Sequence, residues 1–168
     1  MMFLPESKWS PRYESQFYTI RMNTYVTLHK PPSSLSAEED DTFGSNDDIS
    51  CSFFRHCKNC NSHNTKFPAV YYKIDVLRGN TQHTCLRRYS HFVYLCDKVD
   101  LKGEMHKHLP PKTITFFQRS NNKNKEFLDR RMVGLNKFLM DVLLRPESVN
   151  NKWIEAFLEL DKNSDGIL

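Results

Sequence analysis

Cationic and aromatic residues at separate points of the chain could together bind a phosphorylated sugar ring. Arg87, Arg88 and Tyr89 end a strand-like run and put two fixed positive charges directly before an aromatic ring. A guanidinium fork suits a phosphate bidentately, and a tyrosine ring offers a flat apolar wall to the face of a sugar. Lys112 follows two prolines that stiffen its loop, so its ammonium suits a second phosphate.

Arg131 is a cation in a position where a helix normally carries an apolar side chain. It lies between Phe127 and Leu135 on the apolar stripe of a helical pattern. Burying an unpaired charge is costly, so this guanidinium needs a ligand, an intramolecular partner or a path along the helix surface to solvent. Gly134 costs the helix roughly 1 kcal/mol relative to alanine, which indicates that another segment of backbone packs closely there.

We predict that Arg88, Tyr89, Lys112 and Arg131 meet in space. Neighbours on a strand point to opposite faces, but both can border one pocket where the strand ends. Arg87 is then expected to be a charge on the solvent side.

The elements that must position these side chains are predicted to be strands followed by helices. Strands are expected at 18–27, 70–77 and 84–89, and helices at 91–99, between the 120–122 loop and Pro146, and at 151–160. Arg78, Gly79 and Asn80 form a turn signal that makes the second and third strands a hairpin. This order indicates an α+β fold, and one-sided alternation in the first strand favours an antiparallel sheet.

Charge is distributed unevenly along the chain. The 168 residues carry a net charge of +4, too small to indicate nucleic acid as a partner. Residues 67–160 hold 16 lysines and arginines against 10 aspartates and glutamates, a balance of +6, whereas residues 37–48 hold six acidic residues and no basic ones. A basic body with an acidic insert suits an anionic ligand or membrane surface.

The chain is expected to form one domain with a long insert. Residues 1–15 read as a disordered N-terminal tail, 16–160 as the domain, and 161–168 as a tail or the start of a further segment. Residues 31–66 form an acidic insert containing cysteine and histidine between the first two strands. Neither a membrane-spanning run nor a secretory signal is recognisable, so the five cysteines are expected to be reduced thiols of a cytoplasmic protein.

The insert contains a possible zinc site. Cys57 and Cys60 are spaced so that two thiolates can share one tetrahedral ion, and His63 with either Cys51 or His56 could complete the set. Chance clustering in a polar insert explains the same residues.

The last residues resemble the first half of a calcium loop. Asp161, Asn163 and Asp165 would be the oxygen ligands at its first, third and fifth positions, followed by Gly166. The ninth and twelfth positions are missing, so a surface turn is the alternative.

Four motifs, in this order, resemble the phox-homology (PX) domain family. They are Arg-Arg-Tyr-Ser-x-Phe, Leu-Pro-Pro-Lys, the helix sequence Phe-Leu-Asp-Arg-Arg-Met-Val-Gly-Leu-Asn-Lys-Phe-Leu, and Phe-Leu-Glu-Leu. The resemblance implies a three-stranded antiparallel sheet packed on a helical subdomain. It also implies a phosphoinositide-binding module without a cofactor, most often directed to phosphatidylinositol 3-phosphate on the cytosolic face of endosomal membranes.

The resemblance also assigns roles to the four candidate residues. Arg88 would bind the 3-phosphate, Tyr89 would pack under the inositol ring, Lys112 would meet the 1-phosphate, and Arg131 would bind the 4- and 5-hydroxyls. His91 departs from the family pattern, because members commonly carry an acidic residue there.

A membrane-dipping loop is expected beside the pocket. Its candidates are Ile114, Phe116 and Phe117, for which core packing is the alternative. The following basic residues could meet anionic headgroups or remain solvated; they are Arg119, Lys123 and Lys125.

The sequence therefore favours a lipid-binding module that targets a protein to endosomal-type membranes for trafficking or signalling. The alternative is an interaction module with a PX fold and little lipid selectivity, whose protein partners would bind the 31–66 insert. An enzyme is not expected, because no catalytic triad, phosphate loop or carboxylate pair is recognisable.

Overall fold

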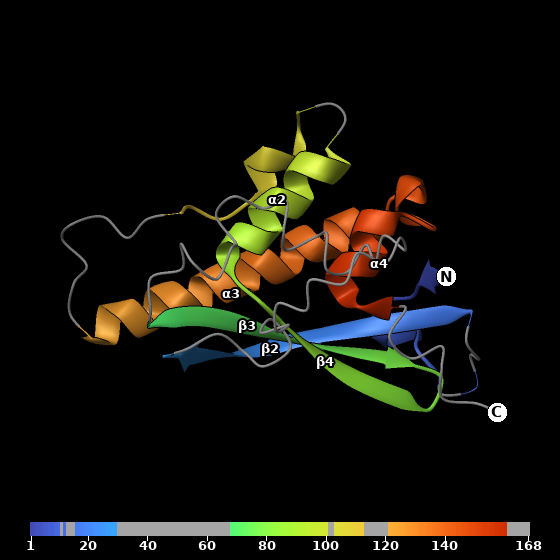
Figure 1. Cartoon of the computed structure of the whole chain (residues 1–168), viewed down its shortest axis with the longest axis horizontal. Helices are drawn as coiled ribbons and strands as arrows, with labels where there is room; N and C mark the ends of the chain where they lie inside the picture. Colours follow the sequence, from blue (N-terminus) through green and yellow to red (C-terminus); the bar gives the residue numbers. More distant parts are fainter. Residues whose placement is uncertain (11, 13–15, 30–67, 101–102, 113–120, 161–168) are drawn as a thin grey trace, which may run out of the picture.

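A mixed sheet with helices on one side forms the domain (Figure 1). The computed structural model describes residues 1–10, 12, 16–29, 68–100, 103–112 and 121–160. The strands, in sheet order, are β1 (Met2–Phe3), β2 (Phe17–Leu28), β3 (Ala69–Arg78) and β4 (Thr81–Arg87). The helices are α2 (Tyr89–Val99), α3 (Asn121–Leu143) and α4 (Lys152–Leu158), with short 3₁₀ turns η1 (Glu6–Lys8), η4 (Met105–His108) and η6 (Pro146–Ser148).

The three predicted strands and their antiparallel pairing are confirmed. β2 pairs with β3, and β3 pairs with β4 through a hairpin in which Arg78 lies opposite Thr81. Gly79 in the turn has a φ of 53°, a left-handed conformation that glycine adopts without steric cost. The α+β class follows from this sheet and the helices after it.

β2 contains an irregularity that the period-2 pattern did not predict. The register shifts between Arg21 and Thr24, so the side chains beyond this point change face. Ile20 and Met22 are buried, but after the shift Tyr25 rather than Thr24 approaches the core, where its ring lies 6.1 Å from that of Tyr72.

The prediction of a disordered N-terminal tail is wrong for its described part. β1 runs parallel to β2, with Met2 opposite Phe17, which makes the sheet four-stranded and mixed. The Phe3 ring packs 5.7 Å from that of Tyr18, and the Glu6 carboxylate lies 2.6 Å from the Arg21 guanidinium. A two-residue strand has no period to detect, so only these tertiary contacts reveal it.

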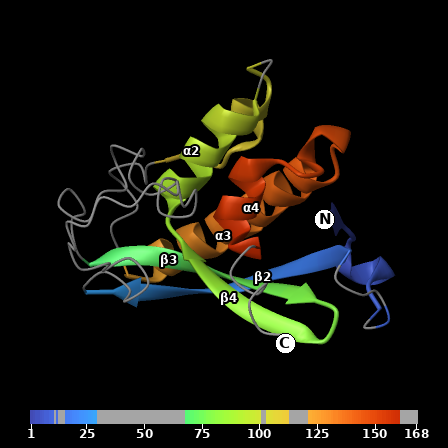
Figure 2. The same cartoon turned by 45° about the vertical axis from the view of Figure 1, so that its right-hand side comes forward.

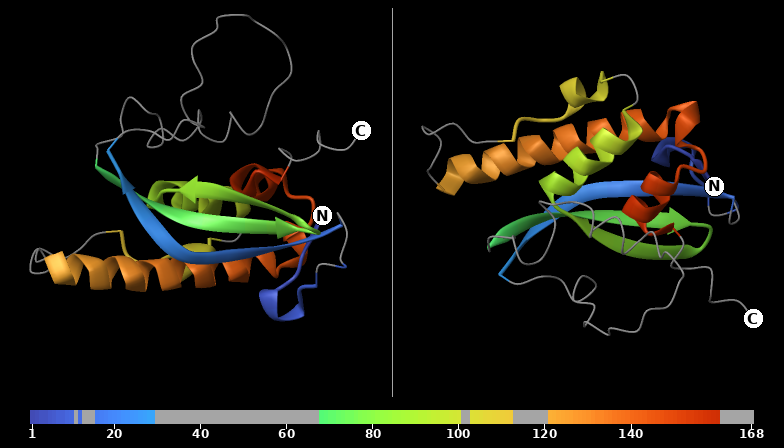
Figure 3. Two further views of the ribbon diagram at one scale, coloured as in Figure 1. Left: turned by 90° about the horizontal axis from the view of Figure 1, so that it is seen from below. Right: turned by 45° about the horizontal axis from the view of Figure 1, so that its top comes forward.

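The core lies between one face of the sheet and the three helices, which Figures 1 and 2 show on the same side of the sheet. The predicted helices are confirmed, with α2 beginning at Tyr89 rather than His91. In Figure 3, α3 runs along the sheet, while α2 and α4 lie at an angle to α3. Leu135, Phe138, Leu139 and Val142 give α3 a buried stripe. No helix of the described ranges is long and apolar enough to cross a membrane.

Several candidate residues lie outside the described ranges. These are the zinc candidates Cys51, Cys57, Cys60 and His63, the calcium candidates Asp161, Asn163 and Asp165, and the membrane candidates Ile114, Phe116 and Phe117. The same holds for the 31–66 insert and for Arg119.

Candidate phosphoinositide site

The junction between β4 and α2 holds Arg88 in a defined backbone conformation. Arg88 is extended, with φ −85° and ψ 162°, and precedes the first residue of α2. Its backbone N–H donates to Nδ1 of His91 at 3.2 Å, and the His91 N–H donates to the Arg88 carbonyl oxygen at 2.9 Å. This reciprocal pair satisfies backbone groups at the start of the helix, as a capping box does. His91 therefore fixes the turn that presents Arg88, a role that the sequence analysis missed.

His91 acts as an acceptor because it is neutral. It is 1% exposed, and burial lowers its pKa well below the ordinary value, helped by the charges of Arg87 and Arg88. A protonated ring would have no lone pair for the Arg88 N–H. The sequence could have suggested this role, because His91 occupies the third helical position, where a capping side chain reaches back to the start of the helix.

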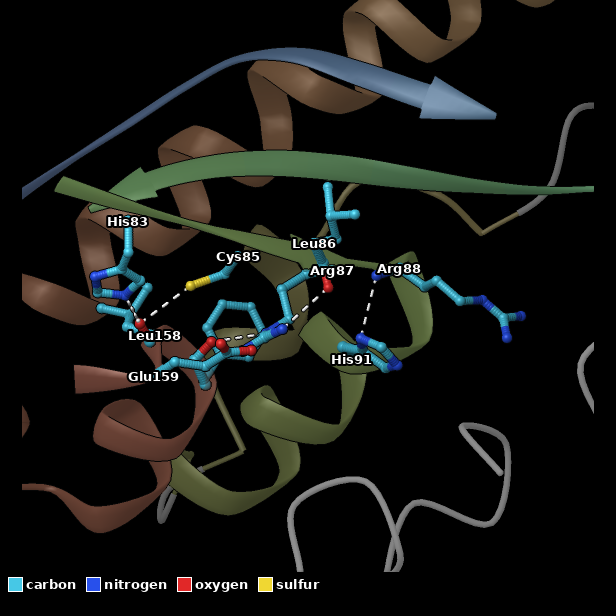
Figure 4. A network of polar contacts seen from close by, with 9 residues as sticks. His83, Cys85, Leu86, Arg87, Arg88, His91, Leu158 and Glu159 are labelled. Carbon is cyan, nitrogen blue, oxygen red and sulfur yellow. Dashed lines mark hydrogen bonds and ion pairs between the residues drawn. The ribbon is translucent and has the colours of Figure 1, made fainter. Parts of the chain in front are cut away.

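Arg87 is buried, and its prediction as a solvent-side charge is wrong. It is 2% exposed, and its Nη2 lies 2.8 Å from Oε1 of Glu159. Its Nε donates to the carbonyl oxygen of Phe157 at 2.7 Å, and its Nη1 donates to that of Leu86 at 3.0 Å. Figure 4 shows these contacts between the end of β4 and α4, with the Arg88 side chain extending away from them. Arg87, which directly precedes the candidate ligand-binding residue Arg88, thus stabilises the fold.

Alternate residues of β4 bind the C-terminal end of α4. His83 Nε2 lies 2.8 Å from the Leu158 carbonyl oxygen, and Cys85 Sγ lies 3.1 Å from the same atom (Figure 4). The last carbonyl groups of a helix have no partner within it, so donors from the strand stabilise this end. Because His83, Cys85 and Arg87 share one face of β4, these contacts hold the strand end that precedes Arg88.

Tyr89 and Arg131 meet, as predicted. The Arg131 guanidinium lies 4.8 Å from the centre of the Tyr89 ring and 4.2 Å from that of Phe127. Contact with two rings orients the guanidinium plane by cation–π attraction. The Tyr89 hydroxyl donates to the Pro110 carbonyl oxygen at 2.6 Å. Burial raises the pKa of Tyr89, while the Arg131 charge lowers it in part.

Arg131 also holds the loop that carries Lys112. Its Nη2 donates to the Pro111 carbonyl oxygen at 3.1 Å and to that of Lys112 at 2.6 Å. These bonds give Nη2 two acceptors, whereas the buried Nε of Arg131 has no hydrogen-bond partner among the described residues. Lys112 itself is exposed, so its ammonium can reach a ligand from a loop fixed at its backbone.

Gly134 permits the close approach of this loop to α3. A Cβ atom added to Gly134 would lie 3.0 Å from Cβ of Pro110. The predicted close packing at this glycine is therefore found, and the neighbour is a proline ring. Glycine on α3, the proline loop, Arg131 and Tyr89 form one packed unit.

These contacts join three of the four candidate residues directly. Tyr89 touches Arg131, and Arg131 bonds to the Lys112 backbone. Arg88 directly precedes Tyr89 in the chain, and its guanidinium lies 6.0 Å from the centre of the Tyr71 ring. A basic and aromatic surface of this kind can bind an anionic sugar phosphate by charge, hydrogen bonds and ring packing.

A three-stranded antiparallel meander is followed by the junction at Arg88 and Tyr89 and by a proline loop that is bonded to the long helix α3. The PX domain family model matches residues 75–161, which include all four candidate residues, and the chain belongs to this family. PX domains are generally phosphoinositide-binding modules.

Known proteins with similar sequences include a sorting nexin and protein kinases. The chain is 31% identical over 103 residues to sorting nexin MVP1 of Yarrowia lipolytica, an alignment that covers 60% of this chain and 17% of the relative. It is 30% identical over 91 residues to the serine/threonine-protein kinase Sgk3 of Rattus norvegicus and of Mus musculus, covering 54% of this chain and 18% of each relative. The matches thus span less than a fifth of the relatives' length.

Proposed function

We propose that this domain binds phosphatidylinositol 3-phosphate and thereby brings its protein to endosomal-type membranes. Arg88 binds the 3-phosphate, Tyr89 packs against the inositol ring, Arg131 bonds to the 4- and 5-hydroxyls, and Lys112 meets the 1-phosphate. The domain acts by binding and not by catalysis. Trafficking and signalling are the contexts that fit such a module.

The arrangement of Arg131 is the observation that carries this proposal. Its guanidinium lies against the Tyr89 ring while its Nη2 bonds to the carbonyl groups of the proline loop. A sugar packed on Tyr89 therefore lies beside an oriented donor, which suits vicinal hydroxyls.

The charge balance of the domain supports a membrane partner. Lys112 is exposed, as is Lys125 near the start of α3. Each basic residue near an anionic surface contributes about 1 kcal/mol, so such residues add to the affinity of the headgroup pocket.

Vesicle sedimentation with each phosphoinositide in turn tests the proposal. Vesicles of phosphatidylcholine containing phosphatidylinositol 3-phosphate are expected to sediment the chain, and those containing phosphatidylinositol alone are not. Equal sedimentation by every phosphoinositide would contradict the 3-phosphate assignment and leave a general charge interaction. Failure to sediment with any of them would favour a PX fold that binds protein partners.

A further inference from the structure

A cluster of metal-ligand side chains lies where α2 meets η4, away from Tyr89 at the other end of α2. Cys96 and Asp100 are four residues apart and therefore share a face of the last turn of α2. His106 comes from η4. The thiol sulfur, a carboxylate oxygen and a ring nitrogen of these residues all lie within 4.8 Å of one another.

The backbone holds this cluster in place. One oxygen of Asp100 accepts the N–H of Glu104 at 3.0 Å, and the other accepts the N–H of Met105 at 2.7 Å. These bonds join the end of α2 to the start of η4, which carries His106. A carboxylate oxygen can accept more than one partner, so these bonds do not by themselves exclude a cation.

A second carboxylate orients the imidazole. Asp97 Oδ1 lies 2.9 Å from Nε2 of His106. Histidines that bind metals usually donate their other ring N–H to a carboxylate, which fixes the tautomer and raises the basicity of the ligand nitrogen. Asp97 can have this supporting role here.

We propose that Cys96, Asp100 and His106 bind one Zn²⁺ ion. A thiolate, an imidazole and a carboxylate form a mixed set that suits zinc, whereas Ca²⁺ and Mg²⁺ prefer oxygen ligands alone. Zinc bonds of about 2.0 to 2.3 Å require the donors to close by on the order of an ångström. Water takes the fourth position.

Burial divides the site into an inner and an outer side. Cys96 is 0% exposed, whereas the His106 side chain is 49% exposed, so an ion enters past the histidine. Zinc binds the thiolate form of cysteine, so the Cys96 thiol gives up its proton when the ion binds.

The ion would join the end of α2 to η4. This turn leads directly into the proline loop that holds Lys112. The proposed role of the ion is therefore to stabilise η4, which precedes the proline loop, against the end of α2.

Metal analysis and cobalt spectroscopy test this site separately from the cysteines of the insert. The background protein carries Cys51→Ser, Cys57→Ser and Cys60→Ser, so that Cys96 and Cys85 are its remaining cysteines. After equilibration with Zn²⁺ and gel filtration, we expect about one zinc per chain and a thermal midpoint that falls on addition of a chelator. Replacement by Co²⁺ should give thiolate-to-cobalt charge-transfer absorption.

Matched variants decide the outcome. Cys96→Ala and His106→Ala should lose the zinc and the cobalt absorption, and Cys85→Ala should keep both. Asp97→Asn should weaken zinc binding by about tenfold. Circular dichroism checks that each variant is folded, and the chelator should no longer lower the thermal midpoint of His106→Ala. The proposal is overturned if the background protein retains no zinc, or if Cys96→Ala retains it.

Discussion

Replacing Arg87 is expected to destabilise the domain, whereas replacing its neighbour Arg88 is expected to remove only lipid binding. Arg87→Met removes the guanidinium that bonds to Glu159 and to the Phe157 carbonyl oxygen. Glu159 keeps its charge with its side chain only 12% exposed. Removing one partner of a buried ion pair leaves the other charge unpaired and lowers the free energy of unfolding by about 3 to 5 kcal/mol.

This cost is large relative to the stability of an ordinary domain, which is about 5 to 15 kcal/mol. For a chain of this size, roughly 2 to 4 °C of thermal midpoint is lost per kcal/mol, so Arg87→Met should lower the midpoint by roughly 6 to 20 °C. Thermal and urea unfolding followed by circular dichroism measure the change. Arg88→Ala should stay within about 0.5 kcal/mol of the wild type.

The double variant Arg87→Met with Glu159→Gln separates the ion pair from the packing. Removing both charges should recover a large part of the loss, because no unpaired charge remains near the core. If Arg87→Met unfolds within about 1 kcal/mol of the wild type, the ion pair does not anchor β4 to α4, and the reasoning fails. Equal destabilisation by Arg88→Ala would also refute it, since Arg88 would then have a structural role.

Three further variants test the positioning of the pocket. Gly134→Ala should weaken vesicle binding about fivefold, because the added Cβ displaces Pro110 and disturbs its hydrogen bond with Tyr89, which is worth about 1 kcal/mol. Unchanged binding would show that the loop adjusts. Arg131→Lys should weaken binding at least tenfold, because an ammonium cannot replace the guanidinium on Tyr89; Arg130→Lys is the control. Below about pH 6.5 the unfolded state protonates His91 while the folded state does not, so the free energy of unfolding should fall as pH decreases, by at most about 1.4 kcal/mol per pH unit. His91→Asn, measured in parallel by urea unfolding, should reduce this slope, and an equal slope in both proteins would contradict the assignment.

The sequence predicted those parts of the fold that are periodic. The antiparallel strands and the stripe of α3 follow from alternation and helical spacing, and the hairpin at Gly79 follows from its turn residues. β1 and the register shift in β2 did not follow, because a two-residue strand has no period and a shift depends on partners distant in sequence.

The site, like the fold, was predicted only in part from the sequence. The sequence indicated Arg131 as a site residue because a cation on an apolar stripe needs a partner. Its contacts with Tyr89 and the proline loop supply one. Arg87 was misjudged, because its partners on α4 lie about 70 residues further along the chain. His91 was noted only as a departure from the family pattern, whereas in the structure its ring accepts the Arg88 N–H.

Binding of the Arg88→Ala variant to phosphatidylinositol 3-phosphate vesicles tests the central claim most directly. Arg130→Ala is the matched control, because it removes the same charge from an exposed side chain that pairs with Glu126. We expect Arg88→Ala to lose binding by at least tenfold with an unchanged thermal midpoint, and Arg130→Ala to bind nearly as well as the wild type. Equal binding by Arg88→Ala and the wild type would contradict the account.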